Sequence, residues 1–200
     1  MARATRRPAR TRDATATREA ILQSARRAFA RRGYDGAGVR EIAQDAGVTA
    51  MLVNRYFGSK ERLFSEAVAE SMATTSVLAP AIVRAHATGA DIAAMLVEIT
   101  KTDAAPLEGF QIMLRSVSSE RAAAIGREQI ERHYQKSIAA ALPGELAPQR
   151  AAVMLSLIAG FQLMRQMTGL TALAKADSKS LVKVLAPVFD QLLAGATKKR

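Results

Sequence analysis

Apolar side chains recur every three or four residues along most of the chain, and the alternation that marks a half-buried strand is missing. The clearest apolar stripe consists of Ile21, Leu22, Ala25, Ala28 and Phe29. This stripe predicts a helix over residues 18–32, and Gly33 is placed to end it, because glycine commonly follows the last residue of a helix. The pattern as a whole predicts an all-α fold.

Three further helices are expected at short intervals. The first two cover about residues 39–46 and 49–57, with Gly47 between them as a helix breaker. The third starts after Ser59, a residue type that caps helix N-termini well. Its apolar face consists of Leu63, Phe64, Ala67, Val68, Ser71 and Met72.

Beyond residue 75, proline and glycine mark the boundaries between elements. We expect helices near residues 80–87, 91–102, 106–116, 119–141, 148–167 and 178–193. The segment 148–167 is apolar on nearly all sides, so that helix must be buried on two of them. Pro187 should kink the last helix, because proline removes one backbone donor.

Positive charge is concentrated in the first third of the chain. The 200 residues include 29 Lys and Arg against 18 Asp and Glu, and residues 1–64 alone hold 14 against 6. The stretch 65–197 is neutral, with twelve of each sign. One part of the chain is therefore suited to an anionic partner, and the rest resembles an ordinary globular body.

The composition argues against several kinds of chemistry. Cysteine is absent, which removes disulfides, thiolate metal ligands and cysteine nucleophiles. The only histidines are His86 and His133, too few for a multi-histidine metal site, and no catalytic motif is present. The apolar run over residues 151–164 is too short to span a bilayer. We therefore expect no enzyme activity, metal, cofactor or membrane partner.

The first 17 residues have no apolar period and predict a flexible basic arm. Its cations are Arg3, Arg6, Arg7, Arg10 and Arg12. Such an arm can follow DNA phosphates or enter a minor groove, which we prefer because the basic bias continues beyond it. A transit peptide and a solvated tail are the alternatives.

Residues 39–49 have the spacing of a helix-turn-helix, with the sequence VREIAQDAGVT. Ala43 is small enough for two helices to approach closely, and Gly47 suits a turn that needs a positive φ. A small core can be closed by Ile42, Val48 and Val53. A simple helical hairpin shares these features, so the helix that follows matters.

That third helix has two distinct faces. At 100° per residue, Leu52, Val53, Tyr56 and Phe57 lie on one side, and Ala50, Met51, Asn54, Arg55 and Gly58 lie on the other. Asparagine can read adenine, and arginine can read guanine or hold a phosphate. Lys60 lies in the first turn of the next helix, where its ammonium and the helix N-terminus can bind one phosphate.

These residues resemble the DNA-binding domain of the TetR family of bacterial repressors. The resemblance covers about residues 15–75 and rests on VREIAQDAGVT, on NRYFGSKERLF and on the apolar stripe of the first helix. It implies about nine helices, three of them in the DNA-binding head. It further implies a homodimer and a small-molecule pocket in the C-terminal body that controls release from a DNA operator.

Position by position, the resemblance implies DNA contacts by Arg40, Thr49, Ala50, Leu52, Asn54, Arg55, Tyr56 and Lys60. Ala37 and Gly38 stand where the family usually caps its second helix, and Met51 and Asn54 replace a common Gly and a common Tyr. We predict three regions: the arm over residues 1–17, a DNA-binding domain over 18–74 with the helix-turn-helix at about 38–57, and a regulatory domain over 75–200.

The regulatory body offers candidates for two sites. Candidate ligand-binding residues are Phe110, Met113, Leu114, His133, Tyr134, Phe161, Gln162 and Arg165, which combine apolar walls with a few polar groups. Arg165 could pair with an anionic ligand, or with an acid such as Asp103 or Glu131. Candidate dimer residues on the last two long helices are Val153, Leu157, Phe161, Leu185 and Phe189, with a monomer core as the alternative.

These patterns predict a DNA-binding regulator, and the resemblance further implies a dimeric bacterial repressor in the cytoplasm that leaves a palindromic operator when an effector binds. An all-helical enzyme or carrier is one alternative, although such a protein has no need for the charge difference at about residue 64. A DNA-coating protein without sequence specificity is the other alternative.

Overall fold

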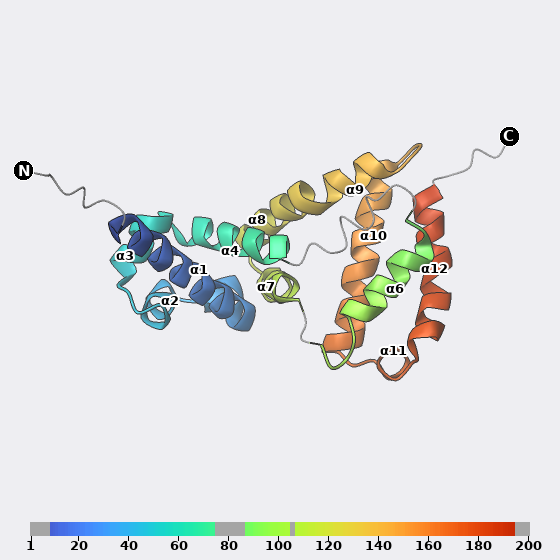
Figure 1. The fold of residues 1–200 in the computed structure, drawn as a ribbon, viewed down its shortest axis with the longest axis horizontal. Coiled ribbons are helices and arrows are strands. Elements are labelled where there is room, and N and C mark those ends of the chain that lie inside the picture. Colours follow the sequence, from blue (N-terminus) through green and yellow to red (C-terminus); the bar gives the residue numbers. More distant parts are fainter. Residues whose placement is uncertain (1–8, 75–86, 105–106, 195–200) are drawn as a thin grey trace, which may run out of the picture. The chain divides into compact units, whose positions relative to one another are not determined.

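A computed structural model describes residues 9–74, 87–104 and 107–194, and all of its regular elements there are helices (Figure 1). The all-α prediction is confirmed for this part of the chain. The helix expected near residues 80–87 lies outside the described residues. The chain forms two compact units: a head unit of Met1–Ser71 and Gln111–Arg127, and a body unit of Met72–Phe110 and Glu128–Arg200.

The head unit begins with four helices: α1 (Ala9–Gly36), α2 (Val39–Asp45), α3 (Ala50–Phe57) and α4 (Lys60–Thr74). The helical backbone of α1 is interrupted at Gly33, with φ 67° and ψ −176°, so the predicted end of the first helix is confirmed. Helix α1 starts well before residue 18, so the prediction of a flexible arm is wrong for residues 9–17, and residues 1–8 lie outside the described part of the chain. Alanine and arginine favour helix, and a formed helix extends readily.

An aromatic cluster forms the centre of the head core. The ring of Phe29 lies 5.0 Å from that of Phe64 in an edge-to-face arrangement, and Tyr34 lies 5.0 Å from Phe64. Ser24 on α1 donates a 2.9 Å hydrogen bond to the carbonyl oxygen of Ile42, which ties α1 to α2. These contacts hold the helix-turn-helix on a rigid base.

Two later helices, α7 (Glu108–Ser116) and α8 (Glu120–Ile130), complete the head unit with residues 111–127. A Cβ atom on Gly33 would lie 2.1 Å from the carbonyl oxygen of Arg115, so only glycine permits this approach. The backbone N–H of Tyr34 donates to Ser116 Oγ at 3.0 Å. Nothing in the apolar periodicity predicts this packing, because it joins segments about eighty residues apart.

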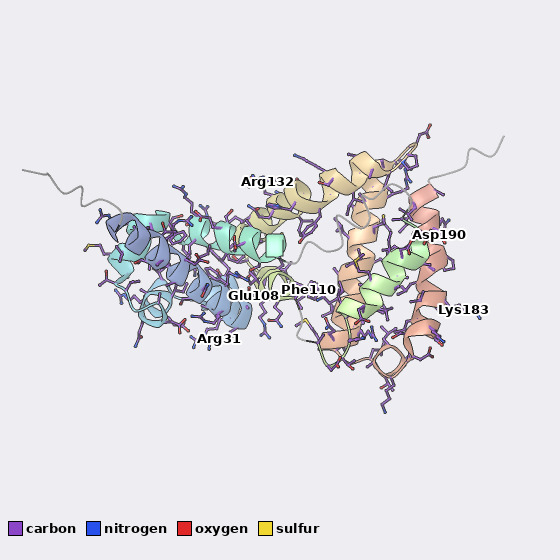
Figure 2. The ribbon with its side chains drawn as sticks, in the orientation of Figure 1. Arg31, Glu108, Phe110, Arg132, Lys183 and Asp190 are labelled. Atoms are coloured by element: carbon purple, nitrogen blue, oxygen red, sulfur yellow. The ribbon has the colours of Figure 1, made fainter. Side chains whose placement is uncertain are left out.

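The body unit is built around α6 (Gly89–Ile99), α9 (Lys136–Ala141), α10 (Ala147–Gln162) and α12 (Ser178–Ala194), with a short α11 (Thr171–Ala174) before the last. Helix α6 packs along α12 (Figure 1), and the Gly89 N–H donates to the Asp190 carboxylate at 2.6 Å (Figure 2). The buried core consists of Ile92, Ala93, Leu96, Val97, Ile138, Leu142, Ala151, Met154, Ile158, Phe161, Leu181, Leu185 and Phe189.

Two stretches of π-helix occur in the body unit, η1 (Glu131–Gln135) and η2 (Leu163–Met167). They divide or extend two of the predicted helices: residues 119–141 become α8, η1 and α9, and residues 148–167 become α10 and η2. A π turn accommodates one extra residue and leaves no signal in the apolar period. Within the described ranges, no helix is both long and apolar enough to cross a membrane.

Candidate nucleic-acid interface and effector site

The turn between α2 and α3 has the geometry of a helix-turn-helix. Gly47 has a φ of 69°, as predicted, and the Val48 N–H donates to the Ala43 carbonyl oxygen at 2.9 Å. Thr49 caps α3, because its hydroxyl oxygen accepts from the Leu52 N–H at 3.3 Å. Gly38 precedes α2 without a side-chain cap. The first turn of α3 is therefore held firmly by its own cap.

The predicted division of α3 into two faces is confirmed. Val53 and Phe57 are buried against the head core, and Leu52 and Tyr56 are half-buried at the boundary. On the other side, Asn54 and Arg55 are exposed, Ala50 is half-buried, and Met51 is 81% exposed. An exposed amide, guanidinium and thioether on one side of a short, capped helix can reach base edges in a major groove.

Several arginines of the head are neutralised by acids on neighbouring helices. Ion pairs join Arg18 to Glu66, Arg27 to Asp45 at 2.6 Å and Arg32 to Glu41 at 3.1 Å. The hydrogen bond from Arg27 holds the pKa of the Asp45 carboxyl below its usual value. Arg40 and Arg55 are exposed and form no such pair with any described residue. Their charges are thus available to an outside anion.

Lys60 is the first residue of α4, and its ammonium lies 4.6 Å from the centre of the Tyr34 ring. The predicted cap at Ser59 is confirmed, because Ser59 Oγ accepts from the Arg62 N–H at 3.2 Å. Hydrogen bonds from its own backbone N–H and from Ser59 keep the pKa of Glu61 low. The half-buried Lys60 therefore holds a cation at the start of a capped helix.

The candidate ligand-binding residues do not all lie in one unit. Met113 and Leu114 belong to the head unit, and the remaining six, Phe110 on α7 among them (Figure 2), belong to the body unit. The Tyr134 hydroxyl donates to the Met72 carbonyl oxygen at 3.0 Å, and burial raises the pKa of this phenol. His133 Nε2 lies 3.1 Å from the side-chain oxygen of Gln129.

The remaining polar candidates, Gln162 and Arg165, are buried at the junction of α10 and η2. Gln162 is 2% exposed and Arg165 is 4% exposed. Arg165 Nη1 donates to the Val97 carbonyl oxygen at 2.6 Å and to Thr100 Oγ1 at 3.1 Å, and burial lowers the pKa of the guanidinium. Neither Asp103 nor Glu131 forms an ion pair with it. Arg165 thus caps the C-terminal end of α6.

The candidate dimer residues differ in their burial within one chain. Phe161, Leu185 and Phe189 are already packed in the body core, at 8%, 7% and 0% exposure. Val153 is 53% exposed and Leu157 is half-buried. Three further exposed apolar side chains, Met164 on η2 and Val184 and Val188 on α12, are not among the candidates, because a helical wheel cannot tell which side neighbouring elements cover.

The chain is similar to known regulators over both of its units. A family model described as bacterial regulatory proteins, tetR family, matches residues 21–67, and one described as tetracyclin repressor-like, C-terminal domain, matches residues 86–193. The HTH-type transcriptional repressor AcnR of Corynebacterium glutamicum is 44% identical over 50 residues, and that of Corynebacterium efficiens is 44% identical over 48. The chain spans only about a quarter of the length of these curated relatives, 27% and 26%.

Solved structures extend the similarity to nearly the whole chain. A TetR-family regulator from Streptomyces coelicolor is 25% identical, with a TM-score of 0.62 over 96% of this chain and 100% of that one. A transcriptional regulator from Rhodococcus sp. Rha1 shares the fold at 19% identity, with a TM-score of 0.64 over 90% of this chain and 99% of that one. Because the C-terminal family model alone covers more than half of the sequence, the chain belongs to the TetR family of bacterial regulatory proteins.

Proposed function

We propose that this protein is a transcriptional repressor that binds a palindromic operator as a homodimer and leaves it when a small-molecule effector binds. The observation that carries this proposal is the outer face of α3, where Asn54 and Arg55 are exposed in a capped helix-turn-helix. Arg55 has no acid partner among the described residues, which suits a side chain whose partner is DNA.

Each residue of this face has a role that follows from its chemistry. Asn54 and Arg55 read base edges in the major groove. The phosphate contacts come from Arg40, Thr49, Tyr56 and Lys60, whose charged or hydroxyl side chains are exposed or half-buried on α2, on α3 and its cap, and at the start of α4. Ala50 and Leu52 lie beside the readers, where a small side chain and an apolar one let the helix enter the groove. The basic segment over residues 1–17, of which residues 9–17 belong to α1, adds phosphate contacts.

The proposed homodimer forms through α10 and α12. Exposed apolar side chains lie on α10 (Val153), on its continuation η2 (Met164) and on α12 (Val184 and Val188). Gly160 lies on the same helix as Val153, and a Cβ atom built on it would meet nothing within 4 Å. Open apolar surface on two helices needs a cover, and a second copy provides one while placing two heads on two half-sites.

Effector binding is proposed to occur in the body unit and to act through helices that belong to both units. Helices α4, α7 and α8 each contribute residues to head and body, so a displacement of their body ends also moves head residues. The Gly33–Arg115 approach connects α7 to α1 within the head. In this proposal the protein has no catalytic role and works in the cytoplasm, where it meets the chromosome.

A footprint on the DNA upstream of the protein's own gene tests the proposal. Protection of one short palindrome at nanomolar protein supports a regulator of this kind. Diffuse protection along the whole fragment would instead support the DNA-coating alternative. No protection at low salt would leave the outer face of α3 without a DNA role.

A further inference from the structure

Two arginines are buried in the described part of the body unit, and they differ in how fully they are hydrogen-bonded. Arg150 donates from Nε to the Glu145 carbonyl oxygen at 3.2 Å, from Nη1 to that of Leu192 at 2.9 Å, and from Nη2 to that of Pro143. All three of its nitrogens are occupied, so Arg150 is a structural residue. Arg165 is more deeply buried, yet its Nε has no hydrogen-bond partner.

Two neighbours of Arg165 share this deficit. Gln162 Nε2 and Gln166 Oε1 are also buried without a hydrogen-bond partner. The three residues are spaced i, i+3 and i+4, which places them on one side of the same helical segment. Buried polar atoms in native proteins almost always have partners, so the two unsatisfied donors of this group, Arg165 Nε and Gln162 Nε2, need an acceptor.

The charge and surroundings of the cluster indicate which partner is missing. Arg165 forms no ion pair with any described acid, and the ring of Phe161 lies 5.8 Å from its guanidinium carbon. The adjoining core residues on α6 and α10, Leu96, Val97 and Ile158, are apolar. A buried cation is best stabilised by an anion that also satisfies its free donors. Because the site has one positive charge and apolar neighbours, it should prefer a ligand that has one negative charge and an otherwise apolar structure.

The backbone supplies an independent observation. Arg165 lies within η2, and the other π stretch of the body unit, η1, carries His133 and Tyr134. Single π turns are rare and are found frequently at functional sites, because they reposition side chains that a regular helix would place elsewhere. Helix α10 contacts η1 and continues into η2, so both π stretches adjoin one helix.

We infer that the body unit binds a monocarboxylate with an apolar chain. Its carboxylate oxygens accept hydrogen bonds from Arg165 Nε and Gln162 Nε2, and its chain lies among the apolar side chains around Phe161. A carboxylate has two acceptor oxygens, one for each of the two donors, whereas a halide offers a single acceptor atom. The claim that this ligand is the effector rests on the proposed function. The claim that the body unit binds it is independent of that function.

Calorimetric titration of the full chain without DNA tests the inference, with octanoate as the probe. Octanamide is the matched neutral control, because it has the same chain and a similar shape without the charge. We expect octanoate to bind at least about tenfold more tightly than octanamide. Butyrate, hexanoate and octanoate should bind progressively more tightly, by about tenfold for every two methylene groups buried.

Two variants assign the binding to the cluster. Arg165→Met keeps the apolar stem and removes every donor, and it should weaken octanoate binding by about 10–100-fold. Arg132→Met is the matched control, because Arg132 is an exposed arginine on η1 (Figure 2) paired with Glu128, and it should leave binding unchanged. Should Arg165→Met fail to fold, Gln162→Leu should still lower the affinity about tenfold.

Several results would overturn the inference. These are equal binding of octanoate and octanamide, unchanged octanoate binding in Arg165→Met or Gln162→Leu, and no octanoate binding up to millimolar concentrations. Binding that depends on Arg165 supports the site whether or not octanoate changes a footprint. If the protein binds octanoate in this way but gives no footprint, the carboxylate site is supported and the proposed function is refuted. The two failures are therefore distinguishable.

Discussion

The polar groups of the head unit and those of the body unit are arranged in opposite ways. On α3 the side chains proposed to read DNA, Asn54 and Arg55, are exposed and come from one continuous stretch of sequence. In the body unit Gln162 and Arg165 are buried. Arg165 donates hydrogen bonds to Val97 and Thr100 at the end of α6, more than sixty residues away in the sequence. An exposed surface suits a large polymer whose charge stays partly hydrated, whereas a buried cluster suits a small ligand removed from water.

The largest effect is expected where the head depends on a distant segment. Gly33→Ala forces a Cβ atom against the Arg115 carbonyl at a positive φ, and should lower the free energy of unfolding by about 2–4 kcal/mol. Gly38→Ala is the matched control, with a negative φ and open space around its Cβ. Urea denaturation measures both, and equal losses would mean that the head does not need residues 111–127.

A charge on the outer side of the body should break the dimer without unfolding the chain. Val184→Glu, at a side chain 71% exposed in one protomer, should weaken association by about 2–3 kcal/mol, or about 30–150-fold. Val117→Glu places the same charge on an exposed valine of the head unit and should leave the dimer intact. Sedimentation at micromolar concentration gives the mass. Wild-type protein that sediments near 21.4 kDa would contradict the dimer itself.

Removal of a base-reading side chain should affect the operator more than other DNA. Asn54→Ala or Arg55→Ala should weaken operator binding by about 1–3 kcal/mol and random-sequence binding by much less. Gln44→Ala, at an exposed amide on α2 outside the proposed contacts, provides the control. Fluorescence anisotropy with both DNAs at one salt concentration measures the difference. Equal losses on both DNAs would show that these side chains are not readers.

Removal of a phosphate-binding cation should have the smallest effect, and that effect should be independent of sequence. Lys60→Ala should lower the slope of log affinity against log salt by about one unit, and deletion of residues 1–12 should lower it by about one unit for each phosphate that the arm neutralises. The measurement is anisotropy at four or more salt concentrations. An unchanged slope after deletion of the arm would leave the arm as a solvated tail.

The head could be predicted from its sequence because its signals are local. The positive φ at Gly47, the cap at Ser59 and the two faces of α3 all follow from residues within a few positions of one another. The packing of Gly33 against Arg115 is a long-range contact that leaves no periodic trace. The π turn at Arg165 leaves no periodic trace either. Nor do the long-range hydrogen bond from Arg165 Nη1 to the Val97 carbonyl oxygen and the unsatisfied Nε of the same side chain.

Sequence-specific DNA binding by the outer face of α3 underlies the proposed function, and the ratio of two affinities tests it. The wild-type dimer is titrated against its footprinted palindrome and against a scrambled duplex of equal length and composition, at one physiological salt concentration. We expect a palindrome affinity at least about a thousandfold higher than the scrambled one. A ratio near one would refute sequence-specific binding, because charge alone would then explain all of the affinity.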